Sequence, residues 1–244
     1  PGAAVTAPEG PLADAQGRRI RYLRLSLTEA CNFACSYCSP HPQQAAAGLP
    51  REAITRLVRV FARLGVERVR LTGGEPTLRP DLLDVVRDIA AAPGIQEIAL
   101  TTNGQLLHRL AAPLRAAGVA RLNVSLDTLR PERLTRLSGR AASLPRVLAG
   151  LASAGQAGFA SLKINAVVMR GFNEDELGDL ARFAWRQGAI ARFIELMPFG
   201  EGEPVPIAEV KALLERQGVR LAPDAARGWG PARHMLGESG EGAR

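Results

Sequence analysis

All three cysteines of the 244-residue chain lie close together, as Cys31, Cys35 and Cys38. The spacing Cys-x3-Cys-x2-Cys indicates a metal or cluster site more readily than a set of disulfides. A structural zinc ion would take His41 as its fourth ligand. An iron–sulfur cluster would be held by the three thiolates alone, and one iron would stay open for a substrate or cofactor. The softness of thiolate ligands and their place in a single loop favour the cluster over zinc.

Other residues that could bind ligands follow or open predicted strands. Gly73, Gly74 and Glu75 come directly after one strand, and glycines let the backbone approach a ligand closely while their carbonyls accept hydrogen bonds. Ser125 ends a later strand, and Arg192 opens another with a guanidinium that suits a carboxylate. The structural alternatives are an ordinary turn for the glycines, a plain loop residue for Ser125, and simple packing for Tyr37 and Met197.

Three cations stand on predicted strands: Arg24 and Arg70 on the first two, and Lys163 on the fifth. A cation that faces inward must find an anion or remain in water, so a triphosphate would satisfy several of them at once. Each of the three could instead point outward into solvent. Lys163 is one of only two lysines in an arginine-rich chain.

The hydrophobic periodicity predicts the elements that must position these residues. Strands are expected at 21–28, 68–72, 97–101, 121–125, 161–168 and 191–197. Helices are expected at 52–64, 80–91, 106–117, 131–137, 144–157, 174–187 and 207–217. Six strand–helix units in alternation predict an α/β fold with a parallel sheet, and we expect a partial (β/α)6 TIM-like barrel. A flat, doubly wound sheet is the alternative, and both place the site at the carboxyl ends of the strands.

The motifs together resemble one enzyme superfamily. The cysteine motif with Tyr37 before its last cysteine resembles that of the radical S-adenosylmethionine (SAM) superfamily. Five later strings continue the resemblance in order: LTGGEP at 71–76, LTTNG at 100–104, LNVSLDTL at 122–129, KINAVV at 163–168 and RFIELMP at 192–198. Over residues 20–200 the chain is similar to the MoaA branch, the GTP 3′,8-cyclases of molybdenum-cofactor biosynthesis.

This resemblance implies a radical SAM lyase with a 4Fe–4S cluster on Cys31, Cys35 and Cys38. SAM would bind the open iron and be cleaved reductively to a 5′-deoxyadenosyl radical. The radical would act on GTP to form (8S)-3′,8-cyclo-7,8-dihydroguanosine 5′-triphosphate. No catalytic residue is expected beyond the cluster ligands.

The resemblance also implies binding residues and partners. SAM-binding residues would be Tyr37, Gly74, Ser125, Arg192 and Met197. GTP-binding residues would be Arg24, Arg70, Thr101 and Lys163. An electron donor such as flavodoxin or ferredoxin would supply the electron, and a homodimer is compatible with the sequence.

One feature departs from the family pattern. The resemblance implies a second cluster on three more cysteines near the C-terminus, but no cysteine follows Cys38. We therefore expect an incomplete copy or a natural short form, and in either case no efficient cyclisation of GTP by this chain. The expected parts are a flexible leader at 1–19, the barrel at 20–217 and an irregular tail at 218–244 that begins a missing C-terminal region. Two other functions stay open. One is a single-cluster radical SAM enzyme on a peptide or another small molecule, and the other is a non-catalytic zinc-binding or scaffold module.

Composition excludes several classes of protein. The net charge is +7, but arginines alternate with acids and not with aromatic residues, which argues against a nucleic-acid partner. No run of about 18 apolar residues predicts a membrane span. The first residues lack the pattern of an export signal, so the expected location is the cytoplasm.

Overall fold

The computed structural model describes residues 10–38, 48–138, 142–197, 201–224, 233–239 and 242–243. His41, the fourth ligand of the zinc alternative, lies outside these residues. Cys31, Cys35, Cys38 and all of the expected SAM- and GTP-binding residues lie inside them.

The main sheet has six parallel strands that lie in chain order. They are β1 (Tyr22–Ser26), β2 (Arg68–Thr72), β3 (Glu97–Thr102), β4 (Val119–Ser125), β5 (Ser161–Val168) and β6 (Ile190–Glu195). The connecting helices are α1 (Arg51–Arg63), η1 (Pro76–Leu78) with α2 (Leu82–Ala90), α3 (Leu107–Ala117), α4 (Pro131–Ser138) with α5 (Leu144–Gln156), and α6 (Leu177–Arg186). The prediction of a helix from residue 80 was two residues early, because a separate 3₁₀ turn precedes α2.

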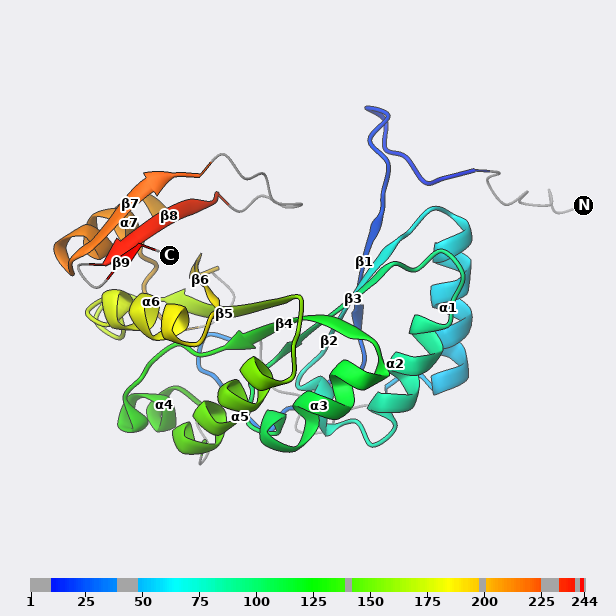
Figure 1. The fold of residues 1–244 in the computed structure, drawn as a ribbon, viewed down its shortest axis with the longest axis horizontal. Helices are drawn as coiled ribbons and strands as arrows, with labels where there is room; N and C mark the ends of the chain where they lie inside the picture. Colours follow the sequence, from blue (N-terminus) through cyan, green and yellow to red (C-terminus); the bar gives the residue numbers. More distant parts are fainter. Residues whose placement is uncertain are drawn as a thin grey trace, which may run out of the picture.

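The strand order decides between the two predicted architectures. A doubly wound sheet reverses direction at a switch point, whereas here every strand lies beside its neighbour in the chain, from β1 to β6. Because each crossover is right-handed, the helices gather on one face of the sheet. Figure 1 shows α1, α2, α3 and α5 side by side along that face. The predicted partial (β/α)6 barrel is therefore confirmed.

Side chains alternate along the strands between a core face and a polar face. In β5, Leu162, Ile164 and Ala166 are buried in the hydrophobic core beneath the helices. Lys163 and Asn165 lie between them in the chain and are half-buried on the opposite face of the sheet. The same period of two therefore packs the helices outside and turns charged groups inward.

The region after β6 differs from the prediction. Helix α7 (Ile207–Arg216) ends near its predicted place, but a three-stranded antiparallel sheet follows it where an irregular tail was expected. Its strands are β7 (Val219–Pro223), β8 (Met235–Ser239) and β9 (Gly242–Ala243). The sequence of β8 does not alternate, because Gly237 takes a core position against the ring of Trp185, where a Cβ atom would lie 2.3 Å from the ring.

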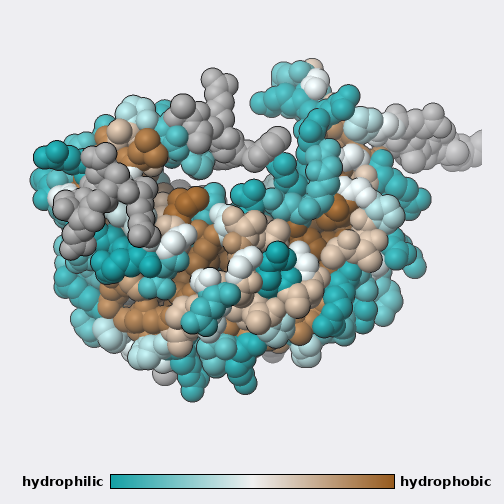
Figure 2. Space-filling view, in the orientation of Figure 1, coloured by the Kyte–Doolittle hydropathy of each residue, from teal (hydrophilic) through white to brown (hydrophobic). Residues whose placement is uncertain are grey.

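The surface of the described residues agrees with the composition. In space-filling form, hydrophobic residues gather toward the middle of the viewed face and hydrophilic residues cover most of its periphery (Figure 2). No helix in the described part of the chain has the length and apolar character needed to cross a bilayer.

Candidate active site

The loop that carries the three cysteines begins after β1 and is held by backbone hydrogen bonds. The amide of Ala34 donates to the carbonyl of Ser138 at 2.5 Å, and that of Ser36 donates to Leu137 at 3.1 Å. Both acceptors lie at the end of α4. The Cys38 amide closes a turn on the carbonyl of Cys35 at 2.9 Å. The cysteines thus lie at the carboxyl edge of the sheet, as the sequence predicted.

The donor set fits an iron–sulfur cluster. None of the three cysteines forms a disulfide. Burial first, and then the negative charges of Asp127, Cys38 and Cys31, raise the pKa of Cys35 to about 12, so three thiolates need a cation to neutralise them. The Phe33 amide donates to the sulfur of Cys31 at 3.4 Å, the kind of contact that tunes cluster thiolates.

Zinc would need a fourth ligand, and His41, which the sequence offers for that place, lies outside the described residues. Three thiolates in one loop suit a cubane cluster, because each binds a different iron and the fourth iron stays open. The thiol chemistry therefore favours the cluster.

The two glycines after β2 pack against the start of the cysteine loop. A Cβ atom on Gly74 would lie 2.3 Å from the carbonyl oxygen of Ala30, and one on Gly73 would lie 2.5 Å from that of Thr28. The Gly74 amide donates to the Thr28 carbonyl at 2.7 Å. Glycine is required here because two backbones touch, so the close approach is to the cysteine loop itself.

Glu75 joins this turn to the next strand. Its side chain is 1% exposed. Its carboxylate accepts from the Thr102 hydroxyl at 2.7 Å, from the Asn103 amide at 2.7 Å, and from the amide and hydroxyl of Thr77. Burial raises the pKa of Glu75, and these donors hold the increase down. Asn103 in turn donates to the side chain of Asn32, between the first two cysteines, at 2.7 Å.

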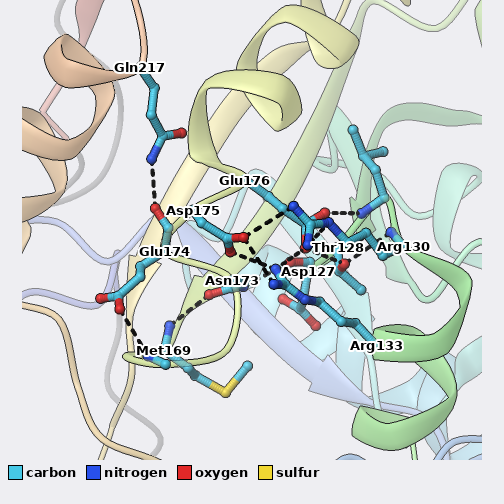
Figure 3. Close-up of polar contacts among 12 residues, drawn as sticks. Asp127, Thr128, Arg130, Arg133, Met169, Asn173, Glu174, Asp175, Glu176 and Gln217 are labelled. Carbon is cyan, nitrogen blue, oxygen red and sulfur yellow. Dashed lines mark hydrogen bonds and ion pairs between the residues drawn. The ribbon is translucent and has the colours of Figure 1, made fainter.

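Tyr37 also turns toward a carboxylate. Its hydroxyl donates to Asp127 at 2.9 Å, at the carboxyl end of β4. Asp127 is 5% exposed, and burial raises its pKa to about 6, against the lowering effect of the Val167 amide and of Tyr37. Asp127 lies in a wider polar network with the loop that follows β5 (Figure 3).

The polar face of the sheet gathers positive charge. Burial, and then the nearby charges of Arg192, Arg121 and Arg70, lower the pKa of Lys163. Burial and Arg70 likewise lower the pKa of Arg192. These cations therefore lie near one another on the same face of the sheet. A polyanion bound there would stabilise this arrangement.

Two buried polar atoms on this face have no hydrogen-bond partner among the described residues. They are the Nε of Arg70 and the Oδ1 of Asn165. The guanidinium of Arg70 lies 5.5 Å from the centre of the Tyr22 ring, which stacks against it without accepting a hydrogen bond. By contrast, Arg121 is satisfied by Glu97 at 2.6 Å. Unsatisfied buried polar atoms are costly, so these two atoms are candidates to bind a polar ligand.

The other predicted residues lie along the same edge. Arg24 pairs with Arg70 in the strand register and is exposed. Ser125 pairs with Asn165, which pairs with Arg192. Thr101 accepts a hydrogen bond from Asn123 at 3.3 Å. Met197 follows β6 and is 59% exposed. The binding roles of these residues stay predictions.

Sequence reasoning missed Asp127 and Asn165 as site residues, and it gave Glu75 no role beyond its place in the turn after a strand. Glu75 and Asp127 stand three and two residues beyond a strand end, where an acid has no packing role, and this position is the signal that could have identified their roles. Asn165 has no such signal, because its importance follows only from a strand register that pairs it with Ser125 and Arg192.

Comparison with known proteins gives consistent matches. Residues 25–184 match the family model of the radical SAM superfamily. The chain is 43% identical over 239 residues to the GTP 3′,8-cyclase of Heliobacterium modesticaldum, covering 91% of this chain and 71% of that protein. It is 48% identical over 196 residues to the GTP 3′,8-cyclase of Stenotrophomonas maltophilia, covering 79% of this chain and 60% of that protein. Molybdenum cofactor biosynthesis protein 1 of Drosophila melanogaster is 44% identical over 204 residues, covering 80% of this chain and 35% of that protein. The chain thus spans 60–71% of the length of the two bacterial relatives.

Solved structures support the fold. Streptococcus suis SuiB bound to S-adenosylmethionine superposes with a TM-score of 0.67 at 21% identity, over 80% of this chain and 46% of that one. Methylornithine synthase (PylB) superposes with a TM-score of 0.58 at 16% identity, over 80% of this chain and 62% of that one.

Proposed function

Because the chain belongs to the radical SAM superfamily, in the branch of its GTP 3′,8-cyclase relatives, we propose that it cleaves SAM reductively and acts on GTP to form (8S)-3′,8-cyclo-7,8-dihydroguanosine 5′-triphosphate. Members of this superfamily use a 4Fe–4S cluster and SAM. The cluster, when bound, supplies the electron that opens the sulfonium bond of SAM. The tasks left to the protein are to hold, orient and shield the reactants.

In this proposal Cys31, Cys35 and Cys38 hold the cluster. The backbone at Gly73–Gly74 closes the adjacent wall. Its contact with residues 28–30 fixes where the glycine carbonyls can meet the ammonium group of SAM. The row of Ser125, Asn165 and Arg192 on three neighbouring strands offers a hydroxyl, an amide and a guanidinium to the polar groups of SAM.

The cationic face would bind the triphosphate of GTP. Two observations on this face support the assignment. The buried Nε of Arg70 has no hydrogen-bond partner in the described part of the chain, and the positive charges of Lys163 and Arg192 repel their neighbours. A triphosphate accepts hydrogen bonds from several donors and neutralises several charges, so it relieves both costs together. Arg24 and Thr101 would extend the same contact along β1 and β3.

The electron would come from a small redox protein such as a flavodoxin or ferredoxin. Cys38, on the cysteine loop, is exposed, so the loop has a side from which such a donor could approach. The source of the electron does not affect the assignment of the cluster or of the cationic face.

The proposal is tested on the full chain, reconstituted anaerobically with iron and sulfide and supplied with dithionite, SAM and GTP. We expect 5′-deoxyadenosine and binding of GTP. Because no cysteine after Cys38 is present to hold a second cluster, the GTP-derived product, whose mass is unchanged since the cyclo and dihydro changes cancel, should form only slowly. SAM cleavage without any GTP-derived product, and without binding of GTP in equilibrium dialysis, would support a radical SAM enzyme with a different substrate.

A further inference from the structure

We propose that Asp127 is a positioning residue for the cluster. Through its hydrogen bond with Tyr37, Asp127 fastens the turn with Cys35 and Cys38 to the carboxyl ends of β4 and β5. The inference concerns how the cysteine loop is held. It rests on the assignment of the cluster to this loop and is independent of which substrate the enzyme uses.

Tyr37 lies between two of the three cluster ligands in the chain. Its hydroxyl donates to one oxygen of Asp127 at 2.9 Å. Its ring packs against a small hydrophobic cluster formed by Leu137, Met169 and Leu196. The ring is therefore fixed at its tip by a hydrogen bond and along its sides by packing, and the short turn closed by the Cys38 amide moves with it.

Asp127 is itself held on a rigid frame. Its second oxygen accepts from the Val167 amide on β5 at 2.7 Å, and its backbone carbonyl accepts from the Asn173 side chain at 2.8 Å. The fully buried Asn173 also donates to the Val167 carbonyl at 2.8 Å and accepts from the Met169 amide at 2.9 Å. Figure 3 shows this frame between the loops that follow β4 and β5.

The segment after Asp127 is fastened a second time. Glu176, which is 2% exposed, accepts from the Thr128 hydroxyl at 2.7 Å and from the Leu129 amide at 2.9 Å. Arg133 pairs with Glu176 and with Asp175 and so ties α4 to the same place (Figure 3). Since the end of α4 accepts the amides of the cysteine loop, the loop meets this frame by a backbone route and by the Tyr37–Asp127 route.

The side-chain route should have a measurable energy. A hydrogen bond to a charged acceptor contributes about 1.5–3 kcal/mol, and a buried carboxylate oxygen left without its donor carries that cost in full. A change of 1.4 kcal/mol in free energy changes an equilibrium constant about tenfold. Loss of the Tyr37 hydroxyl should therefore raise the equilibrium constant for opening of the loop about 10- to 100-fold.

Hydrogen–deuterium exchange of the full chain without iron tests this directly. For Tyr37→Phe we expect faster exchange at residues 34–38 by about 10- to 100-fold, with helix α1 unchanged. Tyr22→Phe is the matched control, because it removes the only other tyrosine hydroxyl, on an exposed side chain of β1, and should leave the loop as it is. Exchange in the loop of Tyr37→Phe that equals wild type would overturn the proposal.

A double-mutant cycle separates positioning from general destabilisation. After anaerobic reconstitution, the rate of iron release to a chelator should rise about tenfold or more in Tyr37→Phe and in Asp127→Asn, and the double variant should be no faster than the faster single variant. Asp179→Asn weakens an exposed ion pair with Arg182 on α6 without touching the loop or α4, and should release iron at the wild-type rate. Additive effects, or equal acceleration by Asp179→Asn, would show that Asp127 acts only on global stability and would contradict the proposal. If Asp127→Asn fails to fold, the exchange result for Tyr37→Phe decides alone.

Discussion

The cysteine end of the sheet and its cationic face satisfy their polar groups in opposite ways. At the cysteine end, the buried Glu75 receives hydrogen bonds from Thr77, Thr102 and Asn103, and both oxygens of Asp127 have donors. On the cationic face, Arg70 keeps a buried donor with no acceptor among the described residues. The protein thus completes the wall of the cluster site by itself and leaves the second region to be completed by a ligand.

This difference follows from the task of each region. A cluster site must have its ligands held before the cluster arrives, so a preorganised frame of buried hydrogen bonds is useful. A substrate site gains affinity and selectivity when its charges become satisfied only on binding. Four variants, each aimed at one of the two regions, test that contrast.

Cys35→Ser should abolish the cluster. A hydroxyl is a poor ligand for iron and Cys35 is one of only three thiolates, so iron content and SAM cleavage should fall to background. The far-ultraviolet circular dichroism should stay native, because the frame around the loop does not use the sulfur. A Cys35→Ser protein that still bound a complete 4Fe–4S cluster would exclude the cysteine trio as the ligand set.

Glu75→Gln should destabilise the fold. The neutral amide keeps the shape but places an NH₂ group where the hydroxyl and amide donors converge. We expect a loss of about 2–3 kcal/mol in the free energy of unfolding, or a Tm lower by roughly 5–10 °C. Urea unfolding measures the change. Glu215→Gln, at the exposed ion pair with Lys211, serves as control and should change the stability by less than about 0.5 kcal/mol. A stability for Glu75→Gln equal to wild type would remove Glu75 from the frame.

Arg70→Ala should weaken polyanion binding. The lost guanidinium should raise the Kd for tripolyphosphate and for a non-hydrolysable GTP analogue by about 10- to 100-fold, the value of one charge-assisted contact. Arg121→Ala is the matched control on the same face, and its effect should stay below about threefold because Arg121 is already paired with Glu97. Equal effects from the two variants, in titration calorimetry at constant ionic strength, would mean that the face attracts anions only through its general charge.

Lys163→Met should stabilise the ligand-free protein slightly while weakening triphosphate binding. The folded pKa of Lys163 lies below the usual 10.5, so the unfolded chain binds more protons between these two values and stability rises with pH there. The penalty is therefore full below the folded pKa and disappears toward pH 10.5. We expect a Tm about 1–3 °C higher than wild type at neutral pH, with the gain shrinking as the pH approaches 10.5. A lower Tm at neutral pH would show that the lysine is not held in an unfavourable field.

Much of the fold could be predicted from sequence because the hydrophobic period changes clearly between strands and helices. The choice of an open barrel followed from counting six units. The C-terminal sheet could not be predicted, because β8 contains Gly237 at a position that packs on Trp185 and so breaks the alternating pattern.

The site could be predicted to the level of its motifs but not of their internal contacts. The cysteine spacing and the resemblance predict Cys31, Cys35 and Cys38 as ligands, and the structure places all three in one loop after β1. Sequence reasoning assigned the glycines only to the close approach of a ligand. The structure adds a second requirement for glycine, because the backbone of Gly73 and Gly74 packs directly against the cysteine loop. The partnership of Tyr37 with Asp127 joins residues 90 positions apart and follows only from the folded sheet.

Electron paramagnetic resonance of the reduced, reconstituted protein, recorded with and without SAM, reports whether the cysteine loop holds a cluster that SAM can reach. We expect an S = 1/2 cluster signal that changes when SAM is added, in the wild type and equally in Arg70→Ala, because the cluster end is complete without the cationic face. A signal that is absent, or one that SAM leaves unchanged, would contradict the assignment of the cysteine loop to SAM chemistry.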